Sequence, residues 1–314
     1  MPEANHIMRG SRTIHPRPVK QRQTIHILTV NYFSSLLVAE LLESIQELGD
    51  ESIEVVIVDN SPNDEALDEL TNQFKATILR PAKNLGFGEG CNFGLRYIHH
   101  QDRSAVVWLL NPDTNLLPNA TTIIRNALKN PPYPAILGTC INTQYGKSWF
   151  RGGSFNSTLG LIPDGNRHKR QKWISNASIC EPSQWVSGCS MILDLSKFSD
   201  VPYFDKNIFL YYEDVDLCLR LAQQGHETYV TNAVLVEHAV SATTAKNPQS
   251  MFRHATFSKL YILSKHASRV AVAMNIIYFT VQPLLVPRGL SHLKGRLQGV
   301  MDFLNLCFNS DRQH

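Results

Sequence analysis

Residues 24–64 have the sequence "TIHILTVNYFSSLLVAELLESIQELGDESIEVVIVDNSPND", in which two apolar runs rich in β-branched residues flank a helical pattern. Residues 24–30 and 53–59 have the length and composition of buried strands, and residues 34–48 repeat apolar side chains at helical spacing. A strand, a helix and a second strand in this order form a βαβ unit, in which the two strands lie parallel. The stretch therefore predicts an α/β fold with a parallel sheet.

The same alternation of strand and helix patterns continues after this stretch. Helices are expected near 64–74, 89–99 and 118–129, and strands at 76–80 and 105–110. Buried strands that alternate with helices of this length are typical of a mostly parallel sheet flanked by helices. A chain of 314 residues has room for one large domain of this kind and an appendage.

Each of the four predicted strands is followed by polar side chains. The first strand has Thr29 near its end and is followed by Asn31 and Tyr32, and the second ends with Asp59 and is followed by Asn60 and Ser61. Asn84 and the turn residue Gly86 follow the third strand, and Asn111 and Asp113 follow the fourth. Because the carboxyl ends of parallel strands border one crevice where ligands bind, the four ends together indicate a nucleotide site. Ordinary turn and capping chemistry explains any one of these positions taken alone.

The glycine-rich stretch "NLGFGEGCNFG" occupies residues 84–94, after the third predicted strand. It lacks the G-x-G-x-x-G pattern that follows the first strand of a dinucleotide-binding fold, and it lacks the G-K-[ST] ending of a P-loop. Its glycines are expected to let the backbone approach a ligand closely. Gly152–Gly153 and Gly188 raise the same expectation, with a purely structural turn as the alternative.

Three carboxylates follow an apolar run in "FLYYEDVDLCLRLAQQG" (209–225), namely Glu213, Asp214 and Asp216. Acidic side chains in the first turn of a helix interact favourably with the helix dipole, which is one explanation for them. The aromatic residues before them should bury the same turn, and a carboxylate in a partly apolar pocket acquires the raised pKa of a general base. The stretch therefore contains a candidate base.

The chain has an acidic middle and basic ends. Residues 1–23 contain five Lys or Arg and one acid, residues 246–314 contain nine and two, and residues 24–238 contain 16 basic and 24 acidic side chains. This distribution argues against a nucleic-acid binder, whose positive charge lies on the folded face. The basic ends suit contact with anionic lipid. Residues 1–23 lack the apolar core of a signal peptide and are expected to form a disordered basic tail.

Seven motifs follow one another along residues 24–245. They are TVNY (29–32), VIVDNSPND (56–64), NLGFGEGCNFG (84–94), LLNPDT (109–114), WVSGCSMIL (185–193), FLYYEDVDLCLRLAQQG (209–225) and VEHAVSATT (236–244). In order and spacing they resemble the family 2 glycosyltransferases of the inverting GT-A type, most closely the bacterial rhamnosyl- and galactofuranosyltransferases of cell-surface polysaccharides. The resemblance implies a GT-A, Rossmann-like catalytic domain at 24–245, with a nucleotide-binding half at 24–114 and an acceptor half at 115–245.

The resemblance also implies roles for the residues at the strand ends. Asp59 would accept hydrogen bonds from the base of a nucleotide sugar, and the segment Thr29–Tyr32 would line the base and ribose, with Asn84, Gly86 and Asn111 nearby. Asp113 would ligate Mg²⁺ or Mn²⁺ on the donor diphosphate, although Asn111 replaces the first acid of the D-x-D motif of many members. His238 would complete the metal site, with a satisfied histidine at a strand end as the alternative.

The resemblance makes Asp214 the catalytic base, which removes the proton of an acceptor hydroxyl roughly 3 Å away. Glu213, Trp185 and Gly188 are expected on the acceptor side, where core packing is an alternative for the aromatic residues. Asp216 is expected to cap the helix or to form an ion pair on it. An oxygen-ligated cation would neutralise the leaving diphosphate, and a single displacement at the anomeric carbon inverts its configuration.

The function predicted from these residues is transfer of a sugar, with rhamnose as a candidate, from a UDP- or dTDP-linked donor to a hydroxyl of a glycan or lipid-linked glycan. One alternative is a sugar-nucleotide pyrophosphorylase, but such enzymes carry a glycine-rich basic stretch after the first strand, where this chain has "NYFSSLLVAE". The other is a non-catalytic sugar-nucleotide-binding protein, which would not need Asp113, Asp214 and His238 together.

The C-terminal region 246–314 differs in character from the rest of the chain. Residues 251–269 and 288–308 are amphipathic and basic, and 270–287 are 18 uncharged residues, short of the roughly 20 that span a bilayer. The region suits a membrane interface, or a helical subdomain packed on the catalytic body or on a second subunit of a homodimer. Six cysteines without a C-x-x-C pair indicate a reducing compartment, so the protein is expected in the cytoplasm, with peripheral attachment to the inner face of the membrane.

Overall fold

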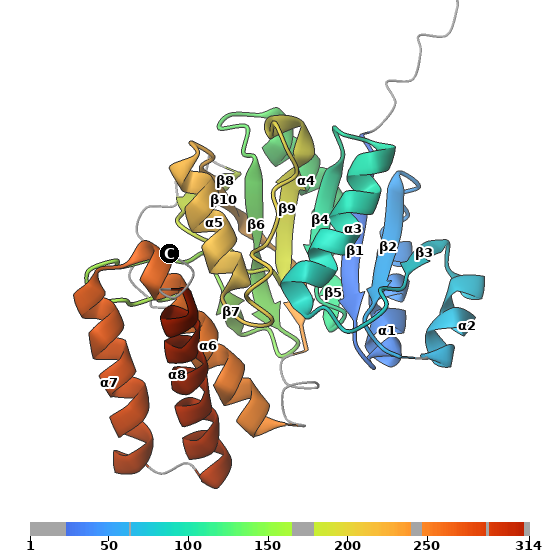
Figure 1. Cartoon of the computed structure of the whole chain (residues 1–314). Helices are drawn as coiled ribbons and strands as arrows, with labels where there is room; N and C mark the ends of the chain where they lie inside the picture. Colours follow the sequence, from blue (N-terminus) through green and yellow to red (C-terminus); the bar gives the residue numbers. More distant parts are fainter. Residues whose placement is uncertain (1–22, 63, 165–178, 240–246, 287–288, 311–314) are drawn as a thin grey trace, which may run out of the picture.

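The computed structural model describes residues 23–62, 64–164, 179–239, 247–286 and 289–310. The basic tail expected at the N-terminus lies outside the described residues, apart from Gln23. Figure 1 shows a broad sheet flanked by helices, with a helical bundle beside it.

The first part of the chain follows the predicted order of strands and helices. The elements are β1 (Ile25–Asn31), α1 (Ser35–Glu47), β2 (Ile53–Asp59), α2 (Glu65–Gln73), β3 (Ala76–Leu79), α3 (Phe87–Gln101), β4 (Val106–Leu110), β5 (Thr114–Leu116) and α4 (Ala120–Lys129). The ends of the predicted elements lie within two residues of these bounds, and β5 is an addition to them. All seven residues of β1 are buried, as expected for a strand covered on both faces.

The described strands join in one sheet. The remaining strands are β6 (Ile136–Thr143), β7 (Ser148–Phe150), β8 (Cys180–Ser183), β9 (Ser190–Asp194) and β10 (Thr228–His238), and a 3₁₀ turn covers Leu195–Lys197. The strand order is β3-β2-β1-β4-β9-β6-β10-β5, with β7 paired to β6 and β8 to β10. Parallel pairing of β3, β2, β1 and β4 confirms the predicted α/β fold. β9 runs antiparallel to both of its neighbours, and β10 runs parallel to β6.

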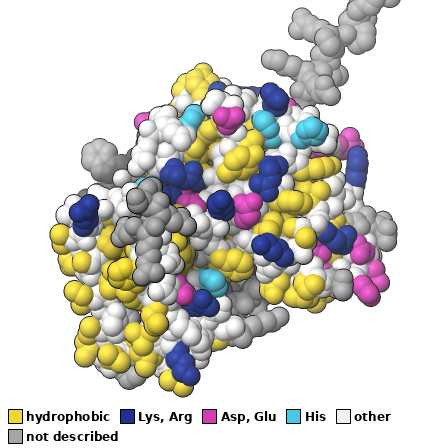
Figure 2. Space-filling view, in the orientation of Figure 1, with side chains coloured by type: hydrophobic (Ala, Val, Ile, Leu, Met, Phe, Trp, Pro, Cys, Tyr) yellow, Lys and Arg dark blue, Asp and Glu magenta, His cyan; other side chains and the backbone are white. Residues whose placement is uncertain are grey.

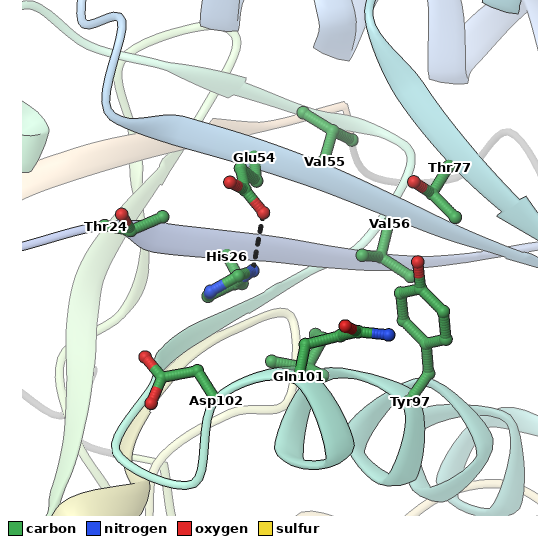
Figure 3. Close-up of a pocket in the computed structure, with 10 residues that line it drawn as sticks. Thr24, His26, Glu54, Val55, Val56, Thr77, Tyr97, Gln101 and Asp102 are labelled. Atoms are coloured by element: carbon green, nitrogen blue, oxygen red, sulfur yellow. Dashed lines mark ion pairs between the residues drawn. The ribbon is translucent and has the colours of Figure 1, made fainter.

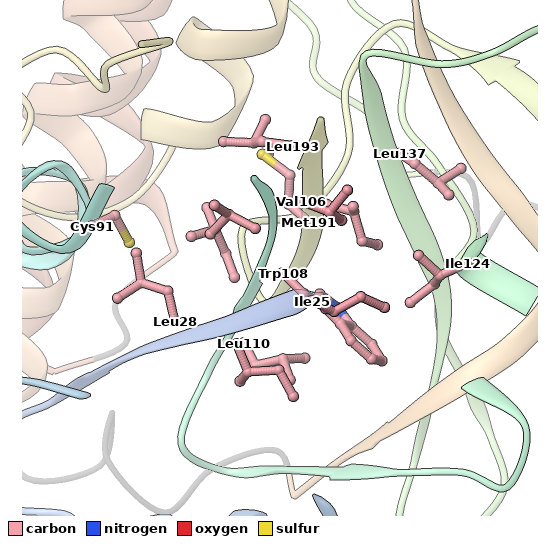
Figure 4. Close-up of a cluster of buried hydrophobic side chains, with 14 of the residues drawn as sticks. Ile25, Leu28, Cys91, Val106, Trp108, Leu110, Ile124, Leu137, Met191 and Leu193 are labelled. Atoms are coloured by element: carbon pink, nitrogen blue, oxygen red, sulfur yellow. The ribbon is translucent and has the colours of Figure 1, made fainter. Parts of the chain in front are cut away.

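The core of the sheet is centred on β4. Trp108 is fully buried, and its indole Nε1 donates a hydrogen bond to Ser190 Oγ on β9 (2.9 Å). Ile25 of β1 and Met191 of β9 belong to the same apolar cluster (Figure 4). Loss of an aromatic side chain from such a core costs about 3–5 kcal/mol, so this packing holds β1, β4 and β9 firmly relative to one another.

Four further helices follow the central strands. They are α5 (Glu213–Gln223), α6 (Pro248–His266), α7 (Arg269–Leu285) and α8 (Leu290–Ser310). The last three form the bundle, at the positions of the three C-terminal segments singled out in the sequence, and their small core contains Leu260, Phe279, Val300 and Phe303. No helix in the described ranges has the length and apolarity needed to cross a bilayer.

The bundle is attached to the sheet through α5 and α6. Ile208 and Val215, just before and within α5, pack against Ile262 of α6. The sheet ends with β10 at His238 and the bundle begins with α6 at Pro248, so the boundary proposed between residues 245 and 246 falls outside the described residues.

Candidate active site

The carboxyl ends of β1 and β2 lie side by side. Asn31 and Asp59 are paired in register there, and Asn31 Nδ2 donates a hydrogen bond to Asp59 Oδ1 (3.0 Å). The same amide group donates to Ser61 Oγ (3.3 Å) and Asp64 Oδ2 (3.0 Å), while Asn31 Oδ1 accepts from the backbone amide of Ser34 (3.1 Å). Asn31 is fully buried, and its side chain holds the Asp59 loop in place. Its expected place beside the base and ribose of a nucleotide stays a prediction.

Asp59 keeps one oxygen without a hydrogen bond. Its Oδ2 atom is buried and has no hydrogen-bond partner among the described residues, and Arg80 Nε lies 3.5 Å from it. Thr29 Oγ1 is also buried without a partner in the described part of the chain, whereas Tyr32 is 47% exposed. Arg80 is a residue that the sequence analysis missed, although it is the last residue of the predicted third strand.

The glycine-rich loop before α3 packs against protein. Gly86 has a φ of +79°, and a Cβ atom on it would collide with the carbonyl oxygen of Phe209. A Cβ on Gly94 would collide with the side chain of Leu28, because α3 crosses β1 closely. Asn84 Oδ1 accepts a hydrogen bond from Gly86 N (2.8 Å) and so supports the turn. These contacts account for glycine at positions 86 and 94, and the close approach of a ligand to this stretch stays a prediction.

Gly153 and Gly188 also lie against other side chains. A Cβ on Gly153 would collide with the indole ring of Trp185, and a Cβ on Gly188 would lie 3.0 Å from the Phe87 ring and 3.6 Å from Asp214 Cβ. Trp185 is half-buried by this packing, so one of its faces is covered by backbone. Contacts within the chain therefore explain glycine at both positions, which agrees with a purely structural role. The Trp185 ring packs against Gly153.

Asp113 and His238 face each other at one edge of the sheet. β5 follows Asp113 directly and pairs antiparallel with β10, whose last residue is His238. Asp113 Oδ1 lies 3.1 Å from His238 Nε2, and the backbone amide of Ala239 donates to Asp113 O (2.9 Å). The Trp149 ring packs edge-on against the imidazole, with 4.5 Å between centroids. Strand pairing, rather than sequence spacing, brings these residues together.

These two side chains fit a cation site that a diphosphate would complete. Mg²⁺ is commonly bound through one or two carboxylates together with phosphate oxygens and water, and carboxylates also suit Mn²⁺. The Asp113 side chain is 13% exposed, and His238 Nδ1 is buried without a partner among the described residues. Within the same residues, no group of three or more His, Cys, Asp or Glu side chains is placed to hold a metal ion by itself.

α5 begins with the two neighbouring carboxylates Glu213 and Asp214. Asp214 Oδ2 accepts a hydrogen bond from Gly188 N (2.9 Å), and Oδ1 accepts one from Val215 N (2.8 Å). Burial raises the pKa of Asp214, although these backbone hydrogen bonds act in the opposite direction. A carboxylate with a raised pKa is a stronger base than an exposed one, as general-base catalysis requires.

Glu213 is more deeply buried than Asp214. Its side chain belongs to the buried set, with 6% exposure, and its Oε2 atom has no hydrogen-bond partner among the described residues. Burial raises the pKa of Glu213, and the charge of Asp214 raises it further. The expected place of Glu213 on the acceptor side, where it would support the pocket or the turn before α5, stays a prediction.

The turn before β9 links the two halves of the site. Cys189 O accepts a hydrogen bond from the backbone amide of Asn111 (3.1 Å), so the loop after β4 is tied to this turn. Burial raises the pKa of the Cys189 thiol, and the charges of Asp113 and Asp214 raise it further. Cys189 is thus within electrostatic reach of both carboxylates, which lie at the same edge of the sheet.

The aromatic run before α5 has an unusual backbone. Tyr211 and Tyr212 have φ angles of +70° and +65°, which bulky residues rarely adopt. Ser258 Oγ of α6 donates a hydrogen bond to Leu210 O (2.9 Å) and helps to hold this conformation. Strained backbone of this kind persists where surrounding contacts fix it, and it is common at active sites.

Asp216 joins α5 to α6 through a buried charge cluster. Its Oδ1 atom lies 2.6 Å from Lys265 Nζ and 3.0 Å from His266 Nε2, and Oδ2 lies 2.6 Å from Arg220 Nε. Burial alone would raise the pKa of Asp216, but hydrogen bonds from His266, Lys265 and Arg220 hold the pKa well below its usual range. The expected ion pair of Asp216 on its own helix is confirmed. Lys265 and His266 were missed because no local pattern connects them to α5.

A cavity of about 400 Å³ opens at the opposite end of the sheet, at the amino ends of β1, β2 and β3 (Figure 3). His26 Nδ1 lies 3.5 Å from Glu54 Oε2 in its wall. Burial lowers the pKa of His26, while the nearby charge of Glu54 acts in the opposite direction. The cavity is lined by none of the residues predicted from the strand ends, so it is separate from the site described above.

The sheet topology and the three aspartates at its carboxyl edge agree with the family expected from the motifs. The chain belongs to glycosyl transferase family 2, whose family model matches residues 24–191. The matched range begins at β1 and ends in β9, so it contains Asp59, Asp113 and Gly188. Asp214 and His238 lie beyond its C-terminal end.

Curated relatives and solved structures are consistent with this assignment. The chain is 24% identical over 265 residues to the N-acetylglucosaminyl-diphospho-decaprenol L-rhamnosyltransferase of Mycobacterium tuberculosis, which covers 77% of this chain and 84% of the relative. It is 24% identical over 208 residues to the rhamnosyltransferase WbbL of Escherichia coli strain K12, covering 64% and 78%. A crystal structure of GalNAc-T7 with UDP, GalNAc and Mn²⁺ has the same fold, with a TM-score of 0.56 and 13% identity over 88% of this chain and 54% of that one.

Proposed function

We propose that this glycosyltransferase moves a sugar from a nucleoside-diphosphate donor to a hydroxyl of a glycan or lipid-linked glycan, with inversion at the anomeric carbon. The observation that carries the proposal is that the turn before β9 contacts both parts of the site: Gly188 N donates to Asp214 Oδ2, and Cys189 O accepts from the backbone amide of Asn111, two residues before Asp113. Asp113 with His238 forms a site for a cation on the donor, and Asp214 provides a base for the acceptor.

In this mechanism the side chain of Asp214 takes the proton of the acceptor hydroxyl. The acceptor oxygen forms a bond to the anomeric carbon as the bond between that carbon and the donor phosphate oxygen breaks. The hydrogen bond from Gly188 N keeps one carboxylate oxygen in place during the step. A divalent cation held by Asp113 and His238 would supply neutralisation of the charge that develops on the diphosphate.

The donor base would bind at the ends of β1 and β2. Asp59 Oδ2 has no hydrogen-bond partner among the described residues and suits the N–H group of a uracil or thymine base. Tyr32 is exposed at the end of β1 and offers a flat face on which a base can stack. These contacts favour a UDP- or dTDP-linked donor, and the names of the two relatives make rhamnose the first sugar to test.

Asp59→Ala is expected to raise the donor KM while changing kcat less. The nucleobase of the donor lies far from the bond that breaks, so its contacts with Asp59 are similar in the ground state and the transition state. Steady-state kinetics with the donor varied at saturating acceptor measures both constants. A collapse of kcat at unchanged KM would place Asp59 next to the reacting atoms and would contradict this assignment.

The proposed function is tested by incubating the purified protein with a panel of UDP- and dTDP-sugars and Mn²⁺. We expect slow release of nucleoside diphosphate from at least one donor, suppressed by EDTA and accelerated by a suitable acceptor. A pyrophosphorylase would instead release nucleoside triphosphate when pyrophosphate is added. Tight binding of a donor without any turnover, with or without acceptor extracts, would favour the non-catalytic alternative.

A further inference from the structure

The outward side of α7 is an apolar surface that no described part of the chain covers. Its exposed residues, here called the α7 face, are Val270, Ala273, Met274, Ile277, Tyr278, Val281, Leu284, Leu285 and the following Val286. They include every exposed position from 270 to 286, and none is charged. Figure 2 shows hydrophobic side chains gathered at the lower left of the molecule, in the region of α7 in Figure 1.

α7 is apolar on its exposed side, and three of its four buried residues, Ala271, Phe279 and Pro283, are apolar as well. A helix on the surface of a water-soluble protein turns its polar side outward and its apolar side toward the core. In α7 the buried side contains Asn275, whose Nδ2 donates to Ala271 O within the same helix (2.9 Å). The exposed side includes Ile277, Leu284 and Leu285, which are 62%, 63% and 75% exposed. A contiguous apolar surface of this extent indicates contact with a partner or a membrane.

The charges around the α7 face are positive. The described residues from 247 onward contain six Lys or Arg and one acid, Asp302, which is paired with Arg253. Arg269 is exposed at the first residue of α7, and Lys294 is exposed near the start of α8, next to the other end of α7. Within the described residues, neither has a carboxylate partner. The apolar face is therefore flanked by a cation at each end.

We propose that the α7 face docks on the surface of an anionic lipid bilayer. Apolar side chains of an interfacial helix enter the boundary between headgroups and acyl chains, and Lys or Arg beside them attract anionic lipids. Tyr278 lies within the face, and tyrosine is enriched at this depth of a membrane. Binding of the α7 face to a bilayer does not depend on the proposed sugar transfer.

A second copy of the chain fits the same face less well. In a twofold dimer, each α7 would lie along the α7 of its partner in either the parallel or the antiparallel direction. Because both ends carry a cation, like charges would approach each other in both arrangements, which is unfavourable. An anionic lipid surface instead complements both ends at once.

Liposome flotation without any sugar donor tests the proposal. We expect the full-length protein to float with vesicles made of equal parts phosphatidylglycerol and phosphatidylcholine, and to float less at high salt, where charges further apart than about 3–10 Å are screened. Vesicles of phosphatidylcholine alone should bind it more weakly. Absence of flotation with the anionic vesicles at low salt would overturn the proposal.

Three variants and one control separate the α7 face and its flanking cations from the rest of the surface. Ile277→Asp combined with Leu284→Asp is expected to weaken vesicle binding by at least about tenfold, because two large apolar side chains no longer enter the interface. Arg269→Gln and Lys294→Gln should each weaken it by about fivefold, on anionic vesicles only. The matched control is Leu36→Asp on α1, which replaces a leucine that is 81% exposed and should leave binding unchanged.

A loss of vesicle binding is informative only if the variant still folds as the unchanged protein does. The substituted side chains are exposed, so the thermal unfolding temperature should stay close to that of the unchanged protein. Equal loss of binding in the Leu36→Asp control, or unchanged binding in the double variant, would overturn the proposal. So would light scattering that shows a dimer which the double variant dissociates, since the α7 face would then be covered by a second copy.

Discussion

Asp214→Asn is expected to lower the rate of sugar transfer by about 10²–10⁴-fold while donor affinity stays close to normal. An amide has nearly the shape of the carboxylate but cannot take a proton from the acceptor hydroxyl. The oxygen of the amide can still accept the hydrogen bond from Gly188 N, so the turn before β9 should keep its position. Single-turnover kinetics, with calorimetric titration of the donor, measures the rate and the affinity separately.

Glu213→Gln is the matched control for this variant. Glu213 is adjacent in sequence but buried, so its replacement should change the rate much less than Asp214→Asn does. The pH profile gives a second check. The base acts in its ionised form, so kcat/KM should rise with pH through the pKa of Asp214. Because burial raises that pKa, the rise should occur at higher pH than for an exposed aspartate. Near-normal turnover of Asp214→Asn would remove this residue from the mechanism.

Asp113→Ala is expected to weaken donor binding in the presence of Mn²⁺ by at least about 100-fold, because loss of residues that only support metal ligands already costs 10–100-fold. Without Mn²⁺, the variant and the unchanged protein should bind the donor with similar weak affinity. Calorimetric titration of the donor with Mn²⁺ and with EDTA measures the difference. The reason is structural, since Asp113 and His238 contact each other at 3.1 Å and could contact one cation together.

His238→Ala should show the same loss to a smaller degree, because the carboxylate carries the charge that attracts the cation. Asp200→Ala is a suitable control, since Asp200 is exposed on the loop that follows β9 and the 3₁₀ turn and belongs neither to the proposed cation site nor to the proposed site for the donor base. Unchanged donor affinity with and without Mn²⁺ in the unchanged protein, Asp113→Ala and His238→Ala would show that the cation site is assigned to the wrong residues.

The sheet could be predicted from the sequence where local pattern determines it. β1 and β2 are buried apolar runs with polar residues directly after them, so both their identity and the position of the ligand edge are visible in residues 24–64. The three-residue strand β5 and the antiparallel insertion of β9 between β4 and β6 could not be predicted in this way. Their placement depends on pairing between segments far apart in the chain.

In the candidate site, too, some residues could be predicted from local sequence and others depend on contacts between distant segments. Asp59, Asp113 and Asp214 each stand out because a carboxylate follows an apolar run. Their supporting residues do not, because Arg80 and Trp149 acquire meaning only through neighbours brought close by folding. Gly86 combines a property that the sequence predicts with a neighbour that only folding brings close. Its positive φ does require glycine, but the atom that approaches it belongs to Phe209 of the same chain.

The buried cluster around Asp216 ties Asp214, the proposed catalytic base, to the bundle. Asp216 and Asp214 share the first turn of α5, and Lys265 and His266 fix that turn to the end of α6, directly before α7. Sliding α6 along α5 would break these charged hydrogen bonds together. If α7 lies on a bilayer, these contacts would keep the Asp214 carboxylate at a fixed distance from the lipid surface. That fixed distance would select which hydroxyl of a membrane-anchored glycan is glycosylated.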